Sequence, residues 1–126
     1  MDGDAEVPRA GPRWFLEGTA ELVGWSVAAA AGMPALPLES ANEEAGVRQA
    51  TLPLRGSETL QGIRADRFGY PVAHFALKYL MRGRPGPTLA TFWRQIAGGL
   101  TWQASFESTF GQTIDAFYTA FESYRP

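Results

Sequence analysis

Apolar residues recur at helical spacing along most of this chain, and this spacing is the feature that most constrains its fold. Within residues 88–96, for example, the apolar side chains fall at positions i, i+3, i+4 and i+7, which is the spacing of one helical face. The alternation of apolar and polar residues that marks a strand never extends beyond a few residues. The 14 glycines and nine prolines divide the chain into short segments. The sequence therefore predicts an all-α fold, a small bundle of five to seven short helices.

The first part of the chain divides at Pro12. Residues 1–11 are polar and contain glycine and proline, so we interpret them as a flexible lead-in. Proline suits the first turn of a helix, and we expect a helix over about 13–31 that ends at Gly32. We interpret residues 12–126 as a single domain, because a chain of 126 residues rarely forms more than one.

The middle of the chain, residues 33–68, has the least regular pattern. Ser40 followed by Glu43 fits a capping box, which predicts a short helix over about 41–50. A further short helix is expected near 57–63. Long connections of this kind are often functional.

The pattern is clearer from residue 69 onward. Pro71 begins a helix that reaches about residue 81, Thr88 is expected to cap the next, and Gly98 ends it. A short helix closed by Gly111 follows, and Thr113 caps the last one. The residues expected to face the core are Ala73, Ala76, Leu77 and Leu80 in the first of these helices, Phe92 and Trp93 in the second, and Ile114, Phe117, Phe121 and Tyr124 in the last.

The first helix is apolar almost all round, which predicts that it is buried. Glu17 and Glu21 interrupt this pattern on one face, between Trp14 and Trp25. A buried carboxylate is unfavourable unless it is paired, hydrogen-bonded or bound to a metal. Two interpretations follow: the carboxylates lie at a partly hydrated rim where they can pair with Arg13, or one of them is a metal ligand or an acid/base group. A second stripe of the same helix consists of Leu16, Ala20, Val23 and Val27.

Residues 14–21 read WFLEGTAE and resemble the W-x-x-E-G-x-A-E segment of the gluzincin zinc metallopeptidases, of the peptidase MA-like group. In that family a preceding helix carries H-E-x-x-H, whose two histidines bind zinc and whose glutamate is the general base. The glutamate of W-x-x-E-G is the third zinc ligand. The resemblance implies that Glu17 occupies this third-ligand position, and that Glu21 supports it from outside the set of ligands.

The resemblance extends loosely over residues 12–125. Residues 70–80 are similar to the family's Y-x-x-A-x-x-F-x-x-Y-L helix, and residues 110–117 to its closing F-G-x-S/T-x-x-x-F element. It implies the C-terminal helical subdomain of a gluzincin. In related peptidases a downstream tyrosine or histidine stabilises the tetrahedral intermediate, and Tyr70 and His74 are the positions that we nominate for this role. The alternative for His74 is a hydrogen-bonded structural residue.

This chain departs from the family in one decisive way, because it contains no H-E-x-x-H and His74 is its only histidine. Zinc in the intact family needs two imidazoles as well as the carboxylate, and the general base is absent too. We therefore expect a metallopeptidase-like domain that binds no zinc and is inactive as this chain alone. It is either a degenerate relative or a fragment of an active zinc peptidase, in which case an in-frame H-E-x-x-H would precede Met1 in the DNA.

A helical protein-interaction module is the alternative function. In an intact gluzincin the third-ligand helix packs beside the metal-binding helix, so the face of Trp14, Glu17, Glu21 and Trp25 is expected to lack its neighbour here. An uncovered apolar face of this kind usually marks a binding surface. We expect it to bind a second copy or a protein partner, and cover by residues 33–68 is the other outcome.

Composition narrows the remaining choices. The chain has 11 Lys and Arg against 13 Asp and Glu, a net charge of −2, which argues against a nucleic-acid partner. The absence of cysteine excludes disulfides, thiolate metal sites and a cysteine nucleophile. The acidic start does not fit a secretory signal, and the longest apolar stretch, 25–38, is shorter than the roughly 20 residues that a membrane span requires. Localisation and substrate stay open.

Overall fold

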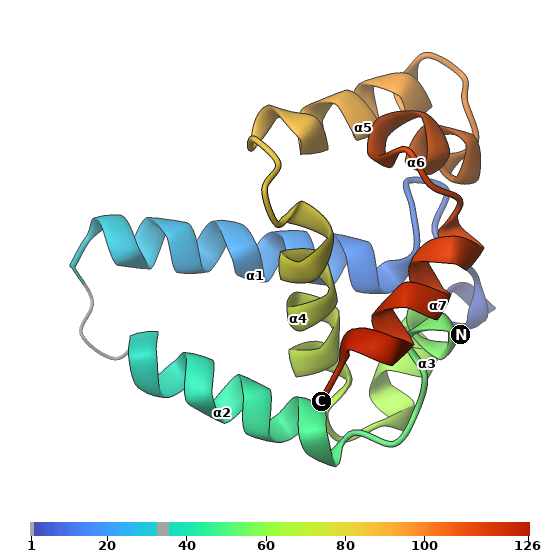
Figure 1. Cartoon of the computed structure of the whole chain (residues 1–126). Coiled ribbons are helices and arrows are strands. Elements are labelled where there is room, and N and C mark those ends of the chain that lie inside the picture. The colour runs from blue at the N-terminus through green and yellow to red at the C-terminus, as the bar shows by residue number, and fades with distance from the viewer. Residues whose placement is uncertain (1, 33–35) are drawn as a thin grey trace.

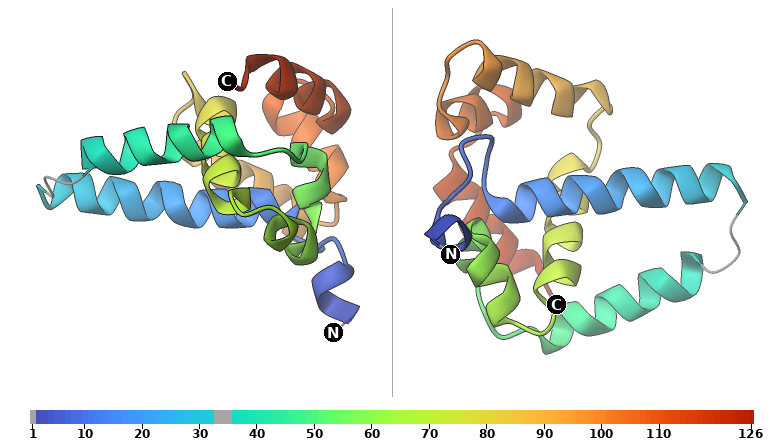
Figure 2. Two further views of the ribbon diagram at one scale, coloured as in Figure 1. Left: turned by 90° about the horizontal axis from the view of Figure 1, so that it is seen from below. Right: turned by 180° about the vertical axis from the view of Figure 1, so that it is seen from behind.

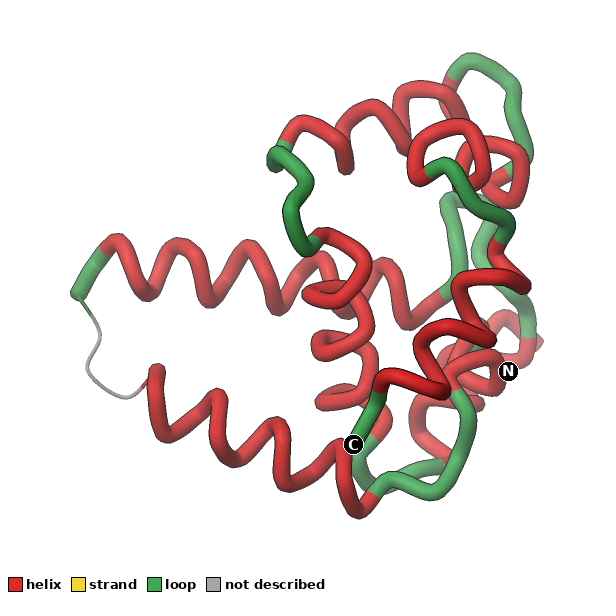
Figure 3. Tube along the Cα trace, in the orientation of Figure 1, coloured by secondary structure: helices red, strands yellow, loops and turns green. Residues whose placement is uncertain are grey.

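The computed structural model describes residues 2–32 and 36–126, and within these ranges it contains helices and loops but no strand (Figures 1 and 3). The predicted all-α bundle of short helices is confirmed. The 3-10 helices are η1 (Asp2–Ala5) and η2 (Leu54–Glu58). The α-helices are α1 (Arg13–Ala30), α2 (Leu36–Gln49), α3 (Leu60–Ala65), α4 (Gly69–Met81), α5 (Pro87–Ala97), α6 (Trp102–Phe110) and α7 (Ile114–Tyr124).

Helix α4 lies at the centre of the molecule and crosses α1 (Figure 1). Its predicted apolar stripe, Ala73, Ala76, Leu77 and Leu80, is buried, so this prediction is confirmed. Around it lies an aromatic core in which most neighbouring rings meet edge-on or tilted and Phe117 stacks on Trp14 and Phe121, arrangements that aromatic pairs favour. Burying each such side chain stabilises the fold by about 1.5–3 kcal/mol. The fully buried aromatic side chains are Trp14, Phe15, Phe92, Phe106, Phe117 and Phe121.

The crossing of α1 and α4 depends on Gly18. A β-carbon built on Gly18 would lie 2.6 Å from the carbonyl oxygen of Ala73 and 2.9 Å from Cβ of Leu77. Both distances are shorter than van der Waals contact, so a larger residue would push the helices apart. The glycine of the E-G pair therefore has a packing function in this fold.

Several predicted helix ends are confirmed. The Thr113 hydroxyl accepts a hydrogen bond from the Ala116 N–H at 3.1 Å. Gly111 ends α6 with φ of 73°, a left-handed conformation that favours glycine. Gly98 is the C-cap of α5.

Three predicted helix starts are wrong. Helix α4 begins at Gly69, two residues before the expected Pro71. The N-cap of α5 is Gly86, two residues before the expected Thr88 cap, because the fixed φ of Pro87 suits the first helical position. Helix α2 begins at Leu36, so Ser40 lies inside the helix and cannot be its N-cap. Pro37 stands in the first turn of α2, where its lack of an N–H group breaks no hydrogen bond.

The predicted burial of the whole first helix is also wrong. The buried residues of α1 are Trp14, Phe15 and Gly18, whereas Val23 is 54% exposed and Val27 is 65% exposed. The reason is geometric, since the second half of α1 and the first half of α2 extend beyond α4 (Figures 1 and 2). An apolar pattern alone does not reveal where the neighbouring helix stops.

Tyr124 differs from its prediction as well. Phe117 and Phe121 face the core as expected, but Tyr124 is 47% exposed. It stands in the last turn of α7 and stacks on Tyr79 with ring centroids 4.2 Å apart. It therefore covers one edge of the aromatic core from outside.

The segment that we interpreted as a lead-in contacts the body of the molecule. Nε1 of Trp93 donates a hydrogen bond to the Ala10 carbonyl at 3.1 Å, and Asp4 lies 3.7 Å from the Arg64 guanidinium. Gly11 and Pro12 are buried. No helix in the described ranges is both long and apolar enough to cross a membrane, in line with the sequence.

Candidate functional site

Glu17 lies at the rim of α1. Its carboxylate Oε1 accepts from Nε of Arg13 at 2.9 Å and lies 2.8 Å from Nη2 of the same guanidinium. The Glu17 side chain is 25% exposed. Of the two interpretations of the acidic face, the partly hydrated rim with an Arg13 pair therefore describes Glu17 as it stands. An exposed i, i+4 pair of this kind contributes only a few tenths of a kcal/mol, about 0.3–0.5, so it leaves the carboxylate free to exchange partners.

Trp14, one turn before Glu17, is fully buried, and its expected place on an uncovered face is wrong. Its indole stacks on Phe117 with ring planes 12° apart. Nε1 donates to the Tyr118 hydroxyl at 3.0 Å, and that hydroxyl in turn donates to Glu58 at 2.5 Å. Burial and the hydrogen bond to Glu58 raise the pKa of Tyr118 well above its ordinary value, so the phenol stays protonated. The sequence could not reveal this burial, because Trp14 is covered by α7, more than 100 residues away.

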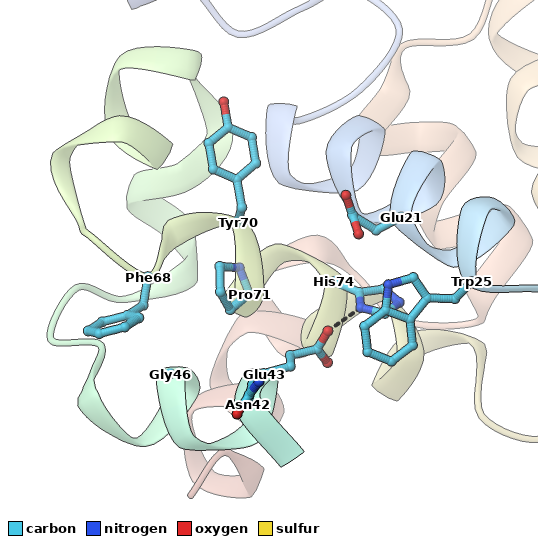
Figure 4. A pocket seen from close by; sticks show the side chains of 9 residues that line it. All are labelled: Glu21, Trp25, Asn42, Glu43, Gly46, Phe68, Tyr70, Pro71 and His74. Carbon is cyan, nitrogen blue, oxygen red and sulfur yellow. Dashed lines mark hydrogen bonds and ion pairs between the residues drawn. The ribbon is translucent and has the colours of Figure 1, made fainter. Parts of the chain in front are cut away.

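The other side chains of the acidic face line a pocket between α1, α2 and α4 (Figure 4). Its volume is about 330 Å³. Gly46 allows α2 to approach here, since a β-carbon on it would lie 3.0 Å from Cδ1 of Phe68. The polar and aromatic lining residues are Glu21 and Trp25 of α1, Asn42 and Glu43 of α2, and Tyr70 and His74 of α4, with Gly46, Phe68 and Pro71 completing the wall.

The floor of this pocket is a buried cluster of ionisable groups. His74 is 1% exposed, and its Nδ1 is hydrogen-bonded to Oε2 of Glu43. The other oxygen of Glu43 lies 2.6 Å from Nζ of Lys78. Removing a carboxylate from water costs several kcal/mol, and the attraction to nearby charged partners offsets about that amount. The buried carboxylate of Glu43 therefore depends on these two partners. His74 is therefore buried and hydrogen-bonded, which fits the structural alternative for this residue.

Two acceptor atoms of the cluster are left without a hydrogen bond from the described residues, namely Nε2 of His74 and Oε1 of Glu43. For Oε1 the Lys78 ammonium supplies charge at 2.6 Å without the geometry of a hydrogen bond. In the tautomer that donates Nδ1–H to Glu43, Nε2 of His74 carries a lone pair. Buried polar atoms without a hydrogen-bond partner are uncommon, and each calls for a specific explanation, such as a catalytic role or a bound water or ion.

Trp25 forms the wall beside this cluster. Its indole meets the His74 ring edge-on, with centroids 4.5 Å apart, and Nζ of Lys78 lies 5.1 Å from the centroid of the indole. Trp25 is half-buried. Residues of α2 complete the pocket around Trp25, while Glu21 stays exposed.

The structure brings Glu21, Tyr70 and His74 into one pocket and leaves Glu17 outside its lining. Tyr70 is 41% exposed, and its hydroxyl points away from His74 (Figure 4). In the part of the chain that is described, no group of three His, Asp or Glu side chains is arranged to hold a metal ion.

Glu43 and Lys78 are the functional candidates that sequence reasoning missed. The sequence pattern predicts that Glu43 belongs to a helix cap. Glu43, Gly46 and Val47, however, share the i, i+3, i+4 spacing of a buried face. That spacing is the signal that could have identified Glu43 as a buried carboxylate. Nothing comparable marks Lys78 in the sequence.

We also compared the chain with known proteins: no family model, no curated protein and no solved structure matches it.

Proposed function

We propose that this chain is a metallopeptidase-like helical domain, equivalent to the C-terminal half of a gluzincin and catalytically incomplete alone. The observation that carries the proposal is the place of Glu17 within the WFLEGTAE segment. Trp14 and Gly18 anchor α1 to α7 and α4, while Glu17 between them stays at the rim with a loosely held Arg13 partner. A carboxylate on a rigid, well-anchored helix is what a metal ligand requires.

The chain supplies only part of the chemistry of such an enzyme. A catalytic zinc site needs three protein ligands and an open position for water, and Glu17 provides one of them. The only imidazole is that of His74, which lines the pocket between α1, α2 and α4, whereas Glu17 lies outside that pocket. Its Nδ1 is already hydrogen-bonded to Glu43. The two zinc-binding histidines and the general base would come from an H-E-x-x-H segment packed beside α1. Tyr70, whose side chain is exposed, and His74 remain our nominations for stabilising a tetrahedral intermediate.

A direct test of the incompleteness measures metal and activity in the purified chain. We expect far less than about one zinc per chain by elemental analysis after dialysis, because the imidazole ligands are lacking. Peptide hydrolysis should stay at background and should not respond to a chelator. A chelator-sensitive activity that is lost in Glu17→Gln would contradict the proposal.

The positive test is to read the DNA upstream of Met1 and to express the chain together with the segment that it encodes. An H-E-x-x-H in frame should give about one zinc per extended chain. Glu17→Gln should then lower the zinc content, whereas Glu44→Gln, on the exposed face of α2, should not. Zinc binding that ignores Glu17 would overturn the ligand assignment.

A second candidate function rests on a different observation, the exposed Val23 and Val27 of α1. These side chains and the exposed Ala20 form an apolar stripe on the solvent-exposed side of α1. Such a stripe is unfavourable in water by about 25 cal/mol per Å² of apolar area that could be buried. We propose on this basis that α1 can act as an interaction surface for a second copy of the chain.

A further inference from the structure

We propose that the pocket between α1, α2 and α4 binds an organic cation, a guanidinium or ammonium group carried on a short aliphatic chain. The proposal goes beyond the metallopeptidase-like function, because that function concerns Glu17, which does not line this pocket. It rests on the charge balance of the pocket, on the unpartnered Nε2 of His74 and on the aromatic walls.

The charges around the pocket favour a cation. Glu21 and Glu43 contribute carboxylates from α1 and α2, and the Lys78 ammonium, paired with Glu43, balances one of them. With a neutral imidazole at His74, one negative charge is left, and it resides on the exposed Glu21. A ligand with a single positive charge restores the balance, whereas an anion would meet the lone pairs of the pocket floor.

The floor of the pocket offers one buried acceptor. Nε2 of His74 receives no hydrogen bond from the described residues, whereas Oε1 of Glu43 is held by the Lys78 ammonium at 2.6 Å. A ligand with several N–H groups satisfies acceptors of this kind, and a guanidinium carries five such groups in arginine. The ring centroids of Trp25 and His74 are 4.5 Å apart, so the indole borders the imidazole in the lining of the pocket.

The walls and the size fit a ligand as large as one side chain. Trp25 and Tyr70 present aromatic rings, which attract cations through their faces and cover the aliphatic part of the ligand. Lys78 already approaches the Trp25 ring at 5.1 Å, so this indole accepts a cation within the structure itself. The volume of about 330 Å³ is near the lower limit of ligand pockets, about 300 Å³.

The test uses two ligands that differ in charge and donors but hardly in shape, butylguanidine and butylurea. Isothermal titration calorimetry on the full chain at low salt should show butylguanidine binding at least about tenfold more tightly, a difference of about 1.4 kcal/mol. The fluorescence of Trp25 should change on titration and should lose this change in Trp25→Phe. Equal binding of the two ligands, or no binding of either, would overturn the proposal.

Two matched variants locate the site. Glu21→Gln should weaken butylguanidine binding at least about tenfold, and because Glu21 is exposed the variant should keep its melting temperature. Glu44→Gln, an exposed carboxylate of α2 outside the pocket, should bind as the parent does. Equal effects of the two variants would show that any binding is unspecific, and the proposal would fall.

A last comparison distinguishes the two sources of such a cation. N-acetyl-arginine methylamide represents the basic side chain of a peptide, and the matching citrulline derivative is its neutral control. Tighter binding of the arginine derivative than of butylguanidine identifies a peptide side chain as the ligand. Weaker binding identifies a free small amine or guanidine. Both outcomes support a cation site.

Discussion

At the scale of single residues, the least ordinary feature is the buried carboxylate of Glu43. It lies between the imidazole of His74 and the ammonium of Lys78, and it joins α2 to α4. Replacing such a cluster by apolar residues is often neutral, whereas removing one member leaves the others buried without a partner. Glu43 therefore ties α2 to the body of the molecule through charge.

We expect Glu43→Ala to lower the free energy of unfolding by about 3 kcal/mol, because it leaves His74 and Lys78 without their partner. Glu44→Ala, one position along the same helix and exposed, should change it by no more than about 0.5 kcal/mol. Urea denaturation followed by circular dichroism measures both values. Equal effects would mean that the cluster does not hold α2 in place.

The carboxyl group of Asp66 allows us to predict how the stability of the fold changes with pH. Burial raises the pKa of its carboxyl, but hydrogen bonds from the backbone N–H groups of Phe68, Leu52 and Thr51, together with the charge of Arg125, outweigh burial and leave the pKa below its usual value. The stability that this carboxylate contributes is complete above the unfolded pKa of about 3.9. It is lost as the pH falls through the lower pKa of the folded state.

Asp66→Asn should therefore be less stable than the parent at pH 7 and should lose less stability between about pH 5 and pH 2. The stability of both proteins, measured by urea denaturation across this range, should converge toward the acid end. A constant difference between the two proteins would show that the charge of Asp66 plays no part.

At the scale of the elements, α1 consists of two unlike halves. The first half carries Trp14, Phe15 and Gly18 into the core, while the second half carries Val23 and Val27 into solvent. The contact with α4 separates the two, and Gly18 is where the helices approach most closely.

Gly18→Ala should lower the free energy of unfolding by about 1–3 kcal/mol, because the added methyl group would lie 2.6 Å from the Ala73 carbonyl oxygen. Gly24→Ala is the matched control on the same helix, since a β-carbon there meets no other atom within 4 Å. It should raise stability by about 0.5–1 kcal/mol through helix propensity. Thermal melting of the two variants should move in opposite directions, and a shared direction would contradict the close crossing.

Features of these helices that depend on neighbouring residues could be predicted from the sequence, whereas features that depend on contacts between helices could not. The class, most helix ends and the buried stripe of α4 follow from spacing and capping residues, because these signals act within one or two turns. The buried face of α1 does not follow from the sequence, since the helix is apolar almost all round. Which face is buried depends on where α4 packs against it. For the site, helical spacing identified Glu17 and Glu21 as candidates, and the family resemblance added Tyr70 and His74. Their grouping depends on Glu43, which reaches His74 from 31 positions away.

At the scale of the whole molecule, exposed Val23 and Val27 raise the question of self-association. We expect the chain to form dimers at concentrations of roughly 100 μM, since small apolar interfaces give weak association. Sedimentation equilibrium measures the solution mass directly.

The variant with both Val23→Glu and Val27→Glu should stay monomeric, because each glutamate would carry charge into the apolar contact. Leu100→Glu, which changes an exposed apolar residue elsewhere, should associate as the parent does. A parent chain that is monomeric at all concentrations would exclude this surface as a homodimer interface.

The hydrogen bond between Trp14 and Tyr118, which spans 104 positions, has a consequence for the synthesis of the protein on the ribosome. A ribosome adds about 5–20 residues per second, so Trp14 is synthesised roughly 5–20 seconds before its partner exists. Throughout that interval the Trp14 indole lacks the α7 residues that cover it. The core can close only once α7 has left the ribosome, so we expect this domain to fold only after its last helix has been synthesised.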